Sequence, residues 1–518
     1  MMQNFIDTIQ KAYTSKGDSI FLGAAMLNGE VMKEAAIRLP LKTMNRHGLI
    51  AGATGTGKTK TLQMITEALS NASVPCLVMD IKGDLSGIAA AGEWNDRIKE
   101  RTEATGYTFE PKAFPVEFYT LAKQNGVQLK ATVSEFGPIL ISKILDLNDT
   151  QAGLVSMIFK FCDDRRLPLL DLKDFIKVLQ YISNEGKAEI SKDYGNISTT
   201  STGTILRKVI ELQQQGADSF FGEPSFEIED LMRINDQGMG LVNVLRLNDL
   251  QDRPKLFASF MLCLLAELYA KLPEEGDLDR PKLCLFIDEA HLIFNEASDT
   301  LLDQIETIIK LIRSKGVGIY FITQSPTDIP AAVLGQLGLK VQHALRAFTA
   351  ADRKSIKMAA ENFPISEFYQ TDEIITQLGM GEALVTGLNE KGIPTPLAAV
   401  MLNPPCSRMN VLTANELDDI CKKSQLIPKY NRVIDERSAY EILSEKLNKA
   451  VENEEASEER ESTVERKSGP KEKSTLEEIL SSPVTKQVAR TATQVLTRTL
   501  LGALGVSTSS RKKKSSWF

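Results

Sequence analysis

The segment from residue 48 to residue 71 constrains the fold more than any other part of the chain. An apolar stretch, GLIA, leads into the glycine-rich turn GATGTGKT, and a helical pattern, KTKTLQMITEALSN, overlaps its end. The turn fits the spacing G-x-x-x-x-G-K-[ST], and its strand–turn–helix order is the context that a phosphate-binding loop requires. Glycines let successive backbone N–H groups point inward, and the helix start adds the positive end of its dipole. The segment therefore predicts a bound triphosphate.

The polar residues of this turn have predicted roles. Lys58 is expected to reach the β- and γ-phosphates as a point charge, and the Thr59 hydroxyl is expected to bind Mg²⁺. Asp80 ends the next apolar stretch, CLVMD, at the same predicted sheet edge. It supports either the Mg²⁺ and the water or only the turn that follows. The candidate nucleotide-binding residues are Gly52, Ala53, Thr54, Gly55, Thr56, Gly57, Lys58, Thr59, Lys60 and Asp80.

A pair of carboxylates follows another apolar strand, KLCLFI. Asp288 is placed to hold the Mg²⁺ shell, so Thr59 and Asp288 are the candidate metal ligands. Glu289, the next residue, is placed to polarise the attacking water. Two carboxylates at the end of a buried strand are costly unless a cation lies beside them. The pair therefore predicts hydrolysis of the triphosphate rather than phosphoryl transfer to a small acceptor.

A third apolar strand, GVGIYFITQ, ends in Gln324. A polar amide at the carboxyl end of a strand lies on the edge where open α/β sheets bind ligands. Gln324 is expected to sense the γ-phosphate or to orient the water. The alternative is an amide that only faces a loop.

Strands alternate with helices, which predicts an α/β fold with a mostly parallel sheet covered on both faces. Six regions are expected along the chain. They are a small β-containing element (1–40), the first part of the α/β core with the phosphate loop (41–90), a mostly helical insertion (91–235), the second part of the core (236–435), a charged flexible linker (436–480), and a basic amphipathic helix with its tail (481–518).

Composition excludes several classes of protein. The net charge of −7 argues against a surface coated for nucleic-acid binding, although it leaves room for a local basic patch. Six scattered cysteines without a CxxC pair and only three histidines argue against a metal or disulfide framework. The acidic N-terminus does not fit a targeting peptide, and no apolar run approaches the roughly 18 residues of a membrane span. These features predict a cytoplasmic protein.

With these motifs in place, the chain resembles the HerA/FtsK superfamily of P-loop motor ATPases, and within it the bacterial HerA-like ATPases of the YjgR type. The resemblance covers most of the chain from residue 18 to about residue 405. Its motifs are GLIAGATGTGKTKTLQ, VMDIKGDLSG, FFGEPSFEIEDLMR, GLVNVLRL, CLFIDEAHLIF, IRSKGVGIYFITQSPTDIP, VQHALRAFTAADRK and GEALVTGLNEKGIPTP.

This resemblance implies a RecA-like core with ATP and Mg²⁺ as cofactors, Glu289 as catalytic base and Gln324 as sensor. It also implies a hexameric ring with ATP bound between subunits. Arg313 matches a superfamily arginine between the carboxylate strand and the glutamine strand, and Arg346 is a second candidate. Each is expected either to meet the γ-phosphate, in its own or a neighbouring subunit, or to form a structural salt bridge.

Three functions fit these features. The first is a ring translocase or helicase-like ATPase that processes DNA, and the second is an ATPase that moves or remodels a protein or gates an assembly. The third is a nucleotide-dependent structural protein with slow turnover. The basic C-terminal segment is expected to be a solvated charge run, a contact for DNA phosphates, or a contact for a protein partner or an anionic surface.

Overall fold

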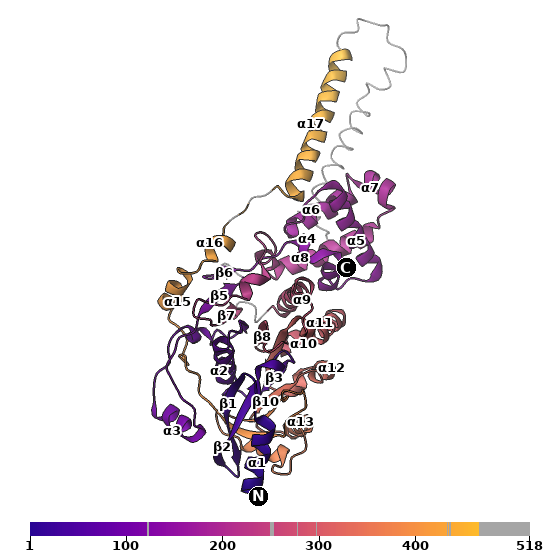
Figure 1. Ribbon diagram of the computed structural model, residues 1–518. Coiled ribbons are helices and arrows are strands. Elements are labelled where there is room, and N and C mark those ends of the chain that lie inside the picture. Colours follow the sequence, from indigo (N-terminus) through magenta and orange to yellow (C-terminus); the bar gives the residue numbers. More distant parts are fainter. Residues whose placement is uncertain are drawn as a thin grey trace, which may run out of the picture. The chain divides into compact units, whose positions relative to one another are not determined.

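Figure 1 shows the computed structural model of the chain, which forms two compact units, Met1–Ser444 and Glu445–Phe518. Across the described part of the chain, every helix is too short or too polar to span a bilayer. The region 481–518, where the sequence predicts a basic amphipathic helix, lies outside the described residues. The structure describes residues 1–121, 124–248, 253–276, 278–296, 298–432, 434 and 437–465.

One sheet of 12 strands organises the first unit, in the order β2-β1-β12-β11-β10-β3-β9-β8-β4-β7-β5-β6. From β10 to β6 all neighbouring strands are parallel, and from β2 to β10 all are antiparallel. The strands are β1 Ser19–Leu27, β2 Glu30–Pro40, β3 Gly48–Ala51, β4 Cys76–Asp80, β5 Val116–Thr120, β6 Val127–Gln128, β7 Val242–Arg246, β8 Leu283–Ile287, β9 Val317–Thr323, β10 Leu339–His343, β11 Glu382–Thr386 and β12 Ala398–Leu402.

Helices connect these strands, and several begin at polar side-chain caps; Thr132, Asn148, Asp171 and Thr349 each close a capping box. The helices are α1 Met2–Tyr13, α2 Lys58–Asn71, α3 Asp96–Thr105, α4 Val133–Ile144, α5 Asp149–Arg165, α6 Leu172–Ser183, α7 Lys187–Tyr194, α8 Thr199–Gln214, α9 Pro254–Lys271, α10 His291–Glu296, α11 Asp299–Ile312, α12 Ala331–Leu334, α13 Ala350–Glu361, α14 Thr371–Gln377, α15 Ala414–Cys421, α16 Ile427–Tyr430 and α17 Ala439–Glu465.

The central strands are apolar along their whole length because helices cover both faces of the sheet. Every residue of β8 and β9 is buried. Phe286 of β8 and Tyr320 of β9 stack with ring centroids 4.8 Å apart. A parallel sheet buried on both faces loses the apolar–polar alternation of a surface strand, and this is the pattern that the sequence carries here. The mostly parallel α/β fold predicted from sequence is confirmed.

The structure refines the expected regions in three places. Strands β5 and β6 extend the parallel sheet, although they fall in the region 91–235, so the helical part is narrower and consists of α4 to α8, which gather at one end of this unit (Figure 1). Strands β1 and β2 join the main sheet because β1 pairs with β12. The region 436–480 contains α17, which is helical from Ala439 to Glu465. Because β1 and β12 lie far apart in sequence, no local pattern predicts that they pair.

Candidate nucleotide site

The carboxyl ends of β10, β3, β9, β8 and β4, five adjacent parallel strands, meet at one edge of the sheet. In an open α/β sheet this edge is where ligands bind. The phosphate loop follows β3, and the carboxylate pair follows β8. The candidates that lie 200 or more residues apart in sequence are therefore neighbours in space.

The phosphate loop curls away from β3 through glycines with positive φ. Gly52, Gly55 and Gly57 have φ of 152°, 78° and 114°, values that side chains with a Cβ rarely adopt. At Gly52 a Cβ would also lie 2.5 Å from the Cβ of His343, the buried last residue of β10. The loop oxygen of Thr56 accepts from the Gly381 nitrogen at 3.0 Å. The loop thus packs against the end of β10 and the start of β11.

Lys58, the first residue of α2, folds its side chain over this loop. Its ammonium donates to the carbonyl of Gly52 at 2.6 Å and to that of Ala53 at 3.1 Å, and the side chain is buried. Burial, followed by the nearby charge of Lys82, lowers the pKa of Lys58. Asp288 and Glu289 lie near enough to favour the charged form, but the hydrogen-bond partners are carbonyls, so an anion entering the loop would supply a stronger, charge-assisted partner.

The Thr59 hydroxyl donates to Oδ2 of Asp84 at 3.3 Å. Asp84 lies in the turn after β4, and that turn is built by Asp80, whose carboxylate accepts the backbone nitrogens of Gly83 at 2.7 Å, Asp84 at 3.1 Å and Leu85 at 3.2 Å. Burial and the neighbouring Asp84 raise the pKa of Asp80 to about 6. Of the two roles expected for Asp80, these bonds are those of the turn.

The carboxylates after β8 are both buried. Burial raises the pKa of Asp288 to about 7, although the charge of Lys82 opposes the shift. Glu289 has a φ of 48°, an uncommon value for a non-glycine residue, and such strain gathers at functional sites. Its carboxylate forms an ion pair with the ammonium of Lys82, and its Oε2 lies 3.1 Å from Nδ1 of His291. Two acids therefore face this edge, and the ammonium of Lys82 lies close to both.

Gln324 lies at the same edge because β9 is the neighbour of β3. The Gly52 nitrogen donates to the carbonyl of Thr323, the residue before Gln324, at 3.3 Å. Asp328 fixes the turn that follows, since it accepts from the Thr323 hydroxyl at 2.5 Å and from the Ser325 nitrogen at 3.1 Å. Gln324 itself is exposed, so its amide is free to face an incoming ligand.

The two candidate arginines lie at opposite ends of the parallel strands, Arg346 at the carboxyl ends beside the phosphate loop and Arg313 at the amino ends. Arg346 follows β10 on the loop side, and its guanidinium donates to the carbonyls of Thr376 at 2.7 Å and Leu378 at 3.3 Å. Arg313 begins a short 3₁₀ turn, Arg313–Lys315, just before β9 starts. The seven residues of β9 separate it from its own phosphate loop by roughly 20 Å. Arg313 is therefore remote from the site within its own chain.

Lys60 points away from the loop. Its ammonium donates to the carbonyl of Met409 and to Oε1 of Gln63, the second at 3.4 Å. Met409 belongs to a segment, residues 403–412, that crosses α2. The structure thus places Lys60 against this crossing segment and apart from the other candidate residues.

Four residues at this edge were not among the sequence candidates: Lys82, Asp84, His291 and His343. The motif VMDIKGDLSG contains the first two, and its unusual density of charge after a buried strand was the available signal. No such sequence signal marks His343, because a histidine at the end of an apolar strand fits an ordinary core position. It is buried beneath the loop, its Nε2 lies 2.9 Å from the Thr61 hydroxyl, and burial lowers its pKa to about 4.

The chemistry of this edge fits a magnesium–nucleotide complex. Oδ1 of Asp84 is buried without a hydrogen-bond partner, while Oδ2 faces the Thr59 hydroxyl. Among the described residues no group of three or more His, Cys, Asp or Glu side chains is arranged to hold a metal alone. Mg²⁺ in nucleotide sites needs only one or two protein carboxylates, because phosphates and waters supply most other ligands. Thr59, Asp84 and Asp288 provide such a partial set.

Known proteins resemble this chain in sequence and fold. The family model "Helicase HerA-like C-terminal" matches residues 26–511. The DNA double-strand break repair helicase HerA of Sulfolobus acidocaldarius is 22% identical over 374 residues, which span 69% of this chain and 66% of that protein. HerA of Sulfurisphaera tokodaii is 24% identical over 400 residues, 73% of this chain and 70% of that protein.

Among solved structures, the bacterial conjugative coupling protein TrwBdeltaN70, in its trigonal form in complex with sulphate, superposes with a TM-score of 0.51 and 13% identity. The superposition covers 79% of this chain and 94% of that one. At this level of identity the likeness concerns the fold alone. The chain spans about two thirds of the length of the first of these HerA relatives.

Proposed function

Because the chain belongs to the helicase HerA-like C-terminal family, we propose that it is a Mg²⁺-dependent ATPase that works as a ring-shaped motor on DNA. One observation carries the ATPase: Lys58 and Thr59 of the loop share the sheet edge with the buried pair Asp288 and Glu289. Phosphate binding and activation of water need these groups side by side.

In this proposal each residue at this edge of the sheet has its own role. Lys58 leaves the carbonyls of Gly52 and Ala53 for the β- and γ-phosphates. Thr59, Asp84 and Asp288 hold Mg²⁺, which neutralises charge on the β- and γ-phosphate oxygens when bound. Gln324 contacts the γ-phosphate or the attacking water from the end of β9.

Glu289 takes the proton of the attacking water as the water oxygen bonds to the γ-phosphorus. The bond between that phosphorus and the β–γ bridging oxygen then breaks, and ADP and phosphate leave. His291, whose Nδ1 lies 3.1 Å from the Glu289 carboxylate, keeps the base oriented. The buried position of Glu289 supports this role, since few waters compete for it.

The arginines support a site shared between subunits. Arg346 lies at the loop edge of its own chain, so we assign it to that subunit's nucleotide. Arg313 lies at the opposite edge, and we assign it to the nucleotide of a neighbouring copy in a hexameric ring. A cation that meets the γ-phosphate from the next subunit stabilises the charge that develops there during hydrolysis, so each site would be complete only between two copies.

DNA is the proposed substrate because the curated relatives with the longest matches are DNA repair helicases. A cytoplasmic location, and a contact of the basic C-terminal segment with a protein partner or an anionic surface, remain predictions from sequence. The experiment is ATP hydrolysis measured with single-stranded, blunt, forked and circular DNA, for the unaltered chain and for Lys58→Ala.

We expect DNA to stimulate hydrolysis and Lys58→Ala to abolish it with and without DNA. A rate of ATP hydrolysis that no form of DNA changes would favour the second function, an ATPase that moves or remodels a protein. A chain that hydrolyses no ATP under any of these conditions would contradict the motor itself.

A further inference from the structure

Lys82 occupies a position that neither the loop motif nor the carboxylate motif includes. It lies in the turn after β4, two residues from Asp80, whose three hydrogen bonds to backbone nitrogens fix that turn. From there its ammonium reaches Oε1 of Glu289 and forms an ion pair. The Lys82 side chain is 39% exposed and that of Glu289 only 8%, so the lysine is the member of the pair with room to move.

The same turn brings Lys82 to the phosphate side of the site. Asp84, two residues on, accepts from the Thr59 hydroxyl at 3.3 Å, so the turn lies against the first residues of α2. The charge of Lys82 is close enough to Lys58 to help lower that residue's pKa, second only to burial. Two ammonium groups therefore flank the space above the loop.

Each of these ammonium groups has a partner that a phosphate would outcompete. Lys58 faces two backbone carbonyls, and Lys82 faces a carboxylate. A terminal γ-phosphate carries more charge than one carboxylate and offers several acceptor oxygens. While Lys82 pairs with Oε1 of Glu289 and His291 lies beside Oε2, neither oxygen of that carboxylate is open to the attacking water.

We propose that Lys82 exchanges Glu289 for the γ-phosphate of bound ATP, so that the base is released only when a triphosphate is present. This inference rests on the proposed nucleotide binding and adds a positioning residue to it. Because ADP lacks the γ-phosphate, the exchange also gives the chain a preference for ATP over ADP. The flexible stem and point charge of lysine suit a change of partner better than the rigid fork of arginine.

The test measures binding rather than turnover. Affinities for a non-hydrolysable ATP analogue and for ADP, both with Mg²⁺, are determined by calorimetry for the unaltered chain, Lys82→Met, Glu289→Gln and the double variant. Lys82→Met should weaken the analogue about tenfold, as expected for loss of one charge-assisted hydrogen bond, and leave ADP unchanged. Glu289→Gln should tighten the analogue, because it removes the competing carboxylate.

The double variant distinguishes an exchange of partners by Lys82 from independent effects of the two charges on nucleotide affinity. The gain from Glu289→Gln should vanish when Lys82 is absent, since the two residues act on one contact. The double variant remains informative if Lys82→Met alone fails to fold because the buried Glu289 charge is left unpaired, since the double variant lacks that charge. Comparison of the double variant with Glu289→Gln then measures the contribution of Lys82 without that charge.

Lys310→Met is a matched control, since the exposed Lys310 of α11 likewise pairs with a less exposed glutamate, Glu306. It should change neither affinity. Equal weakening of both nucleotides by Lys82→Met, or a gain from Glu289→Gln that persists without Lys82, would overturn the exchange but leave the ATPase standing. An unaltered chain that binds neither nucleotide would overturn the proposed function and the exchange together.

Discussion

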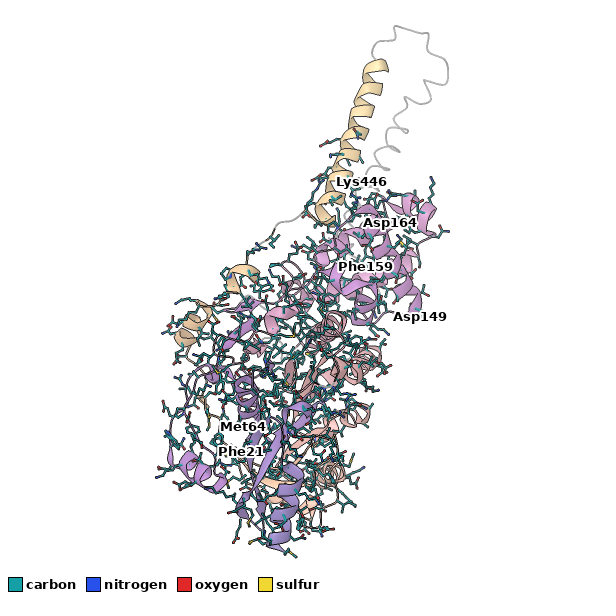
Figure 2. The ribbon with its side chains drawn as sticks, in the orientation of Figure 1. Phe21, Met64, Asp149, Phe159, Asp164 and Lys446 are labelled. Atoms are coloured by element: carbon teal, nitrogen blue, oxygen red, sulfur yellow. The ribbon has the colours of Figure 1, made fainter. Side chains whose placement is uncertain are left out.

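The carboxylate of Glu67 lies 2.6 Å from the backbone nitrogen of Cys406, although 339 positions separate the two residues. Glu67 also accepts from the nitrogen of Ser407 at 3.1 Å and from its hydroxyl. It stands on α2, the helix that begins with the phosphate loop. A cavity of about 480 Å³ borders this contact. Phe21 and Met64, both labelled in Figure 2, belong to its lining. The crossing segment 403–412 is thereby bonded to the helix that carries the nucleotide site.

This contact predicts how stability depends on pH. Burial, against the opposing hydrogen bonds, raises the pKa of Glu67 from 4.5 to about 7. Between these two pH values the folded chain keeps a proton that the unfolded chain has released. Stability is therefore highest below about pH 4.5, falls as the pH rises to about 7, and levels off above it. The fall amounts to something on the order of 3 kcal/mol. Glu67→Gln, which cannot ionise, should show a smaller loss of Tm between pH 5 and pH 8.

Glu100→Gln serves as the control for this experiment, because Glu100 is exposed on α3. Its Tm should follow that of the unaltered chain at both pH values. An identical fall in Tm for Glu67→Gln would mean that the Glu67 carboxylate does not titrate in this range.

Removal of the proposed base should separate binding from hydrolysis. Glu289→Gln keeps the size of the side chain but cannot accept the proton, so we expect hydrolysis to fall by about 10²- to 10⁴-fold. Binding of the non-hydrolysable ATP analogue should persist. Steady-state phosphate release and calorimetry measure the two properties, and turnover that survives would reassign the base.

Mixing of inactive variants tests where each arginine acts. Arg313→Ala and Glu289→Gln are both expected to lack activity. In mixed rings, an Arg313→Ala subunit beside a Glu289→Gln subunit has an intact base and receives Arg313 from its neighbour, so activity should reappear. Phosphate release measured against mixing ratio reports it.

Arg346→Ala mixed with Glu289→Gln is the matched control for the same assay. Because Arg346 lies at the loop edge of its own chain, no combination of these subunits contains a complete site. Recovery with Arg346→Ala, or its absence with Arg313→Ala, would reverse the assignment of the two arginines.

Glycine at position 52 should be required for packing as well as for backbone freedom. Gly52→Ala places a Cβ 2.5 Å from the Cβ of His343 and 3.2 Å from its backbone carbon, at a φ of 152°. Such overpacking costs about 1–3 kcal/mol, so Tm should fall. Gly203→Ala has the opposite sign, because a Cβ inside α8 meets only Nη1 of Arg207 at 3.8 Å and gains about 0.5–1 kcal/mol of helix stability. Thermal unfolding of both variants checks the pair.

Sequence alone was sufficient for the parts of this protein that local chemistry dictates. The glycine spacing before Lys58 requires one loop conformation, and fully apolar runs ending in Asp288 or Gln324 require strands buried on both faces. These patterns determined the α/β class, the mostly parallel sheet and the edge where the candidate site lies. They succeed because backbone freedom, periodicity and desolvation act within a few residues.

Tertiary structure decided what depends on distant partners. The parallel pairing of β10, β3 and β9 placed the end of β10, which Arg346 follows, at the loop edge and the start of β9, which Arg313 precedes, at the other. Folding also set Lys82 against Glu289 and turned Lys60 toward Met409. Ion pairs and hydrogen bonds act over a few ångströms, so they depend on which segments the sheet brings together and not on their separation along the chain.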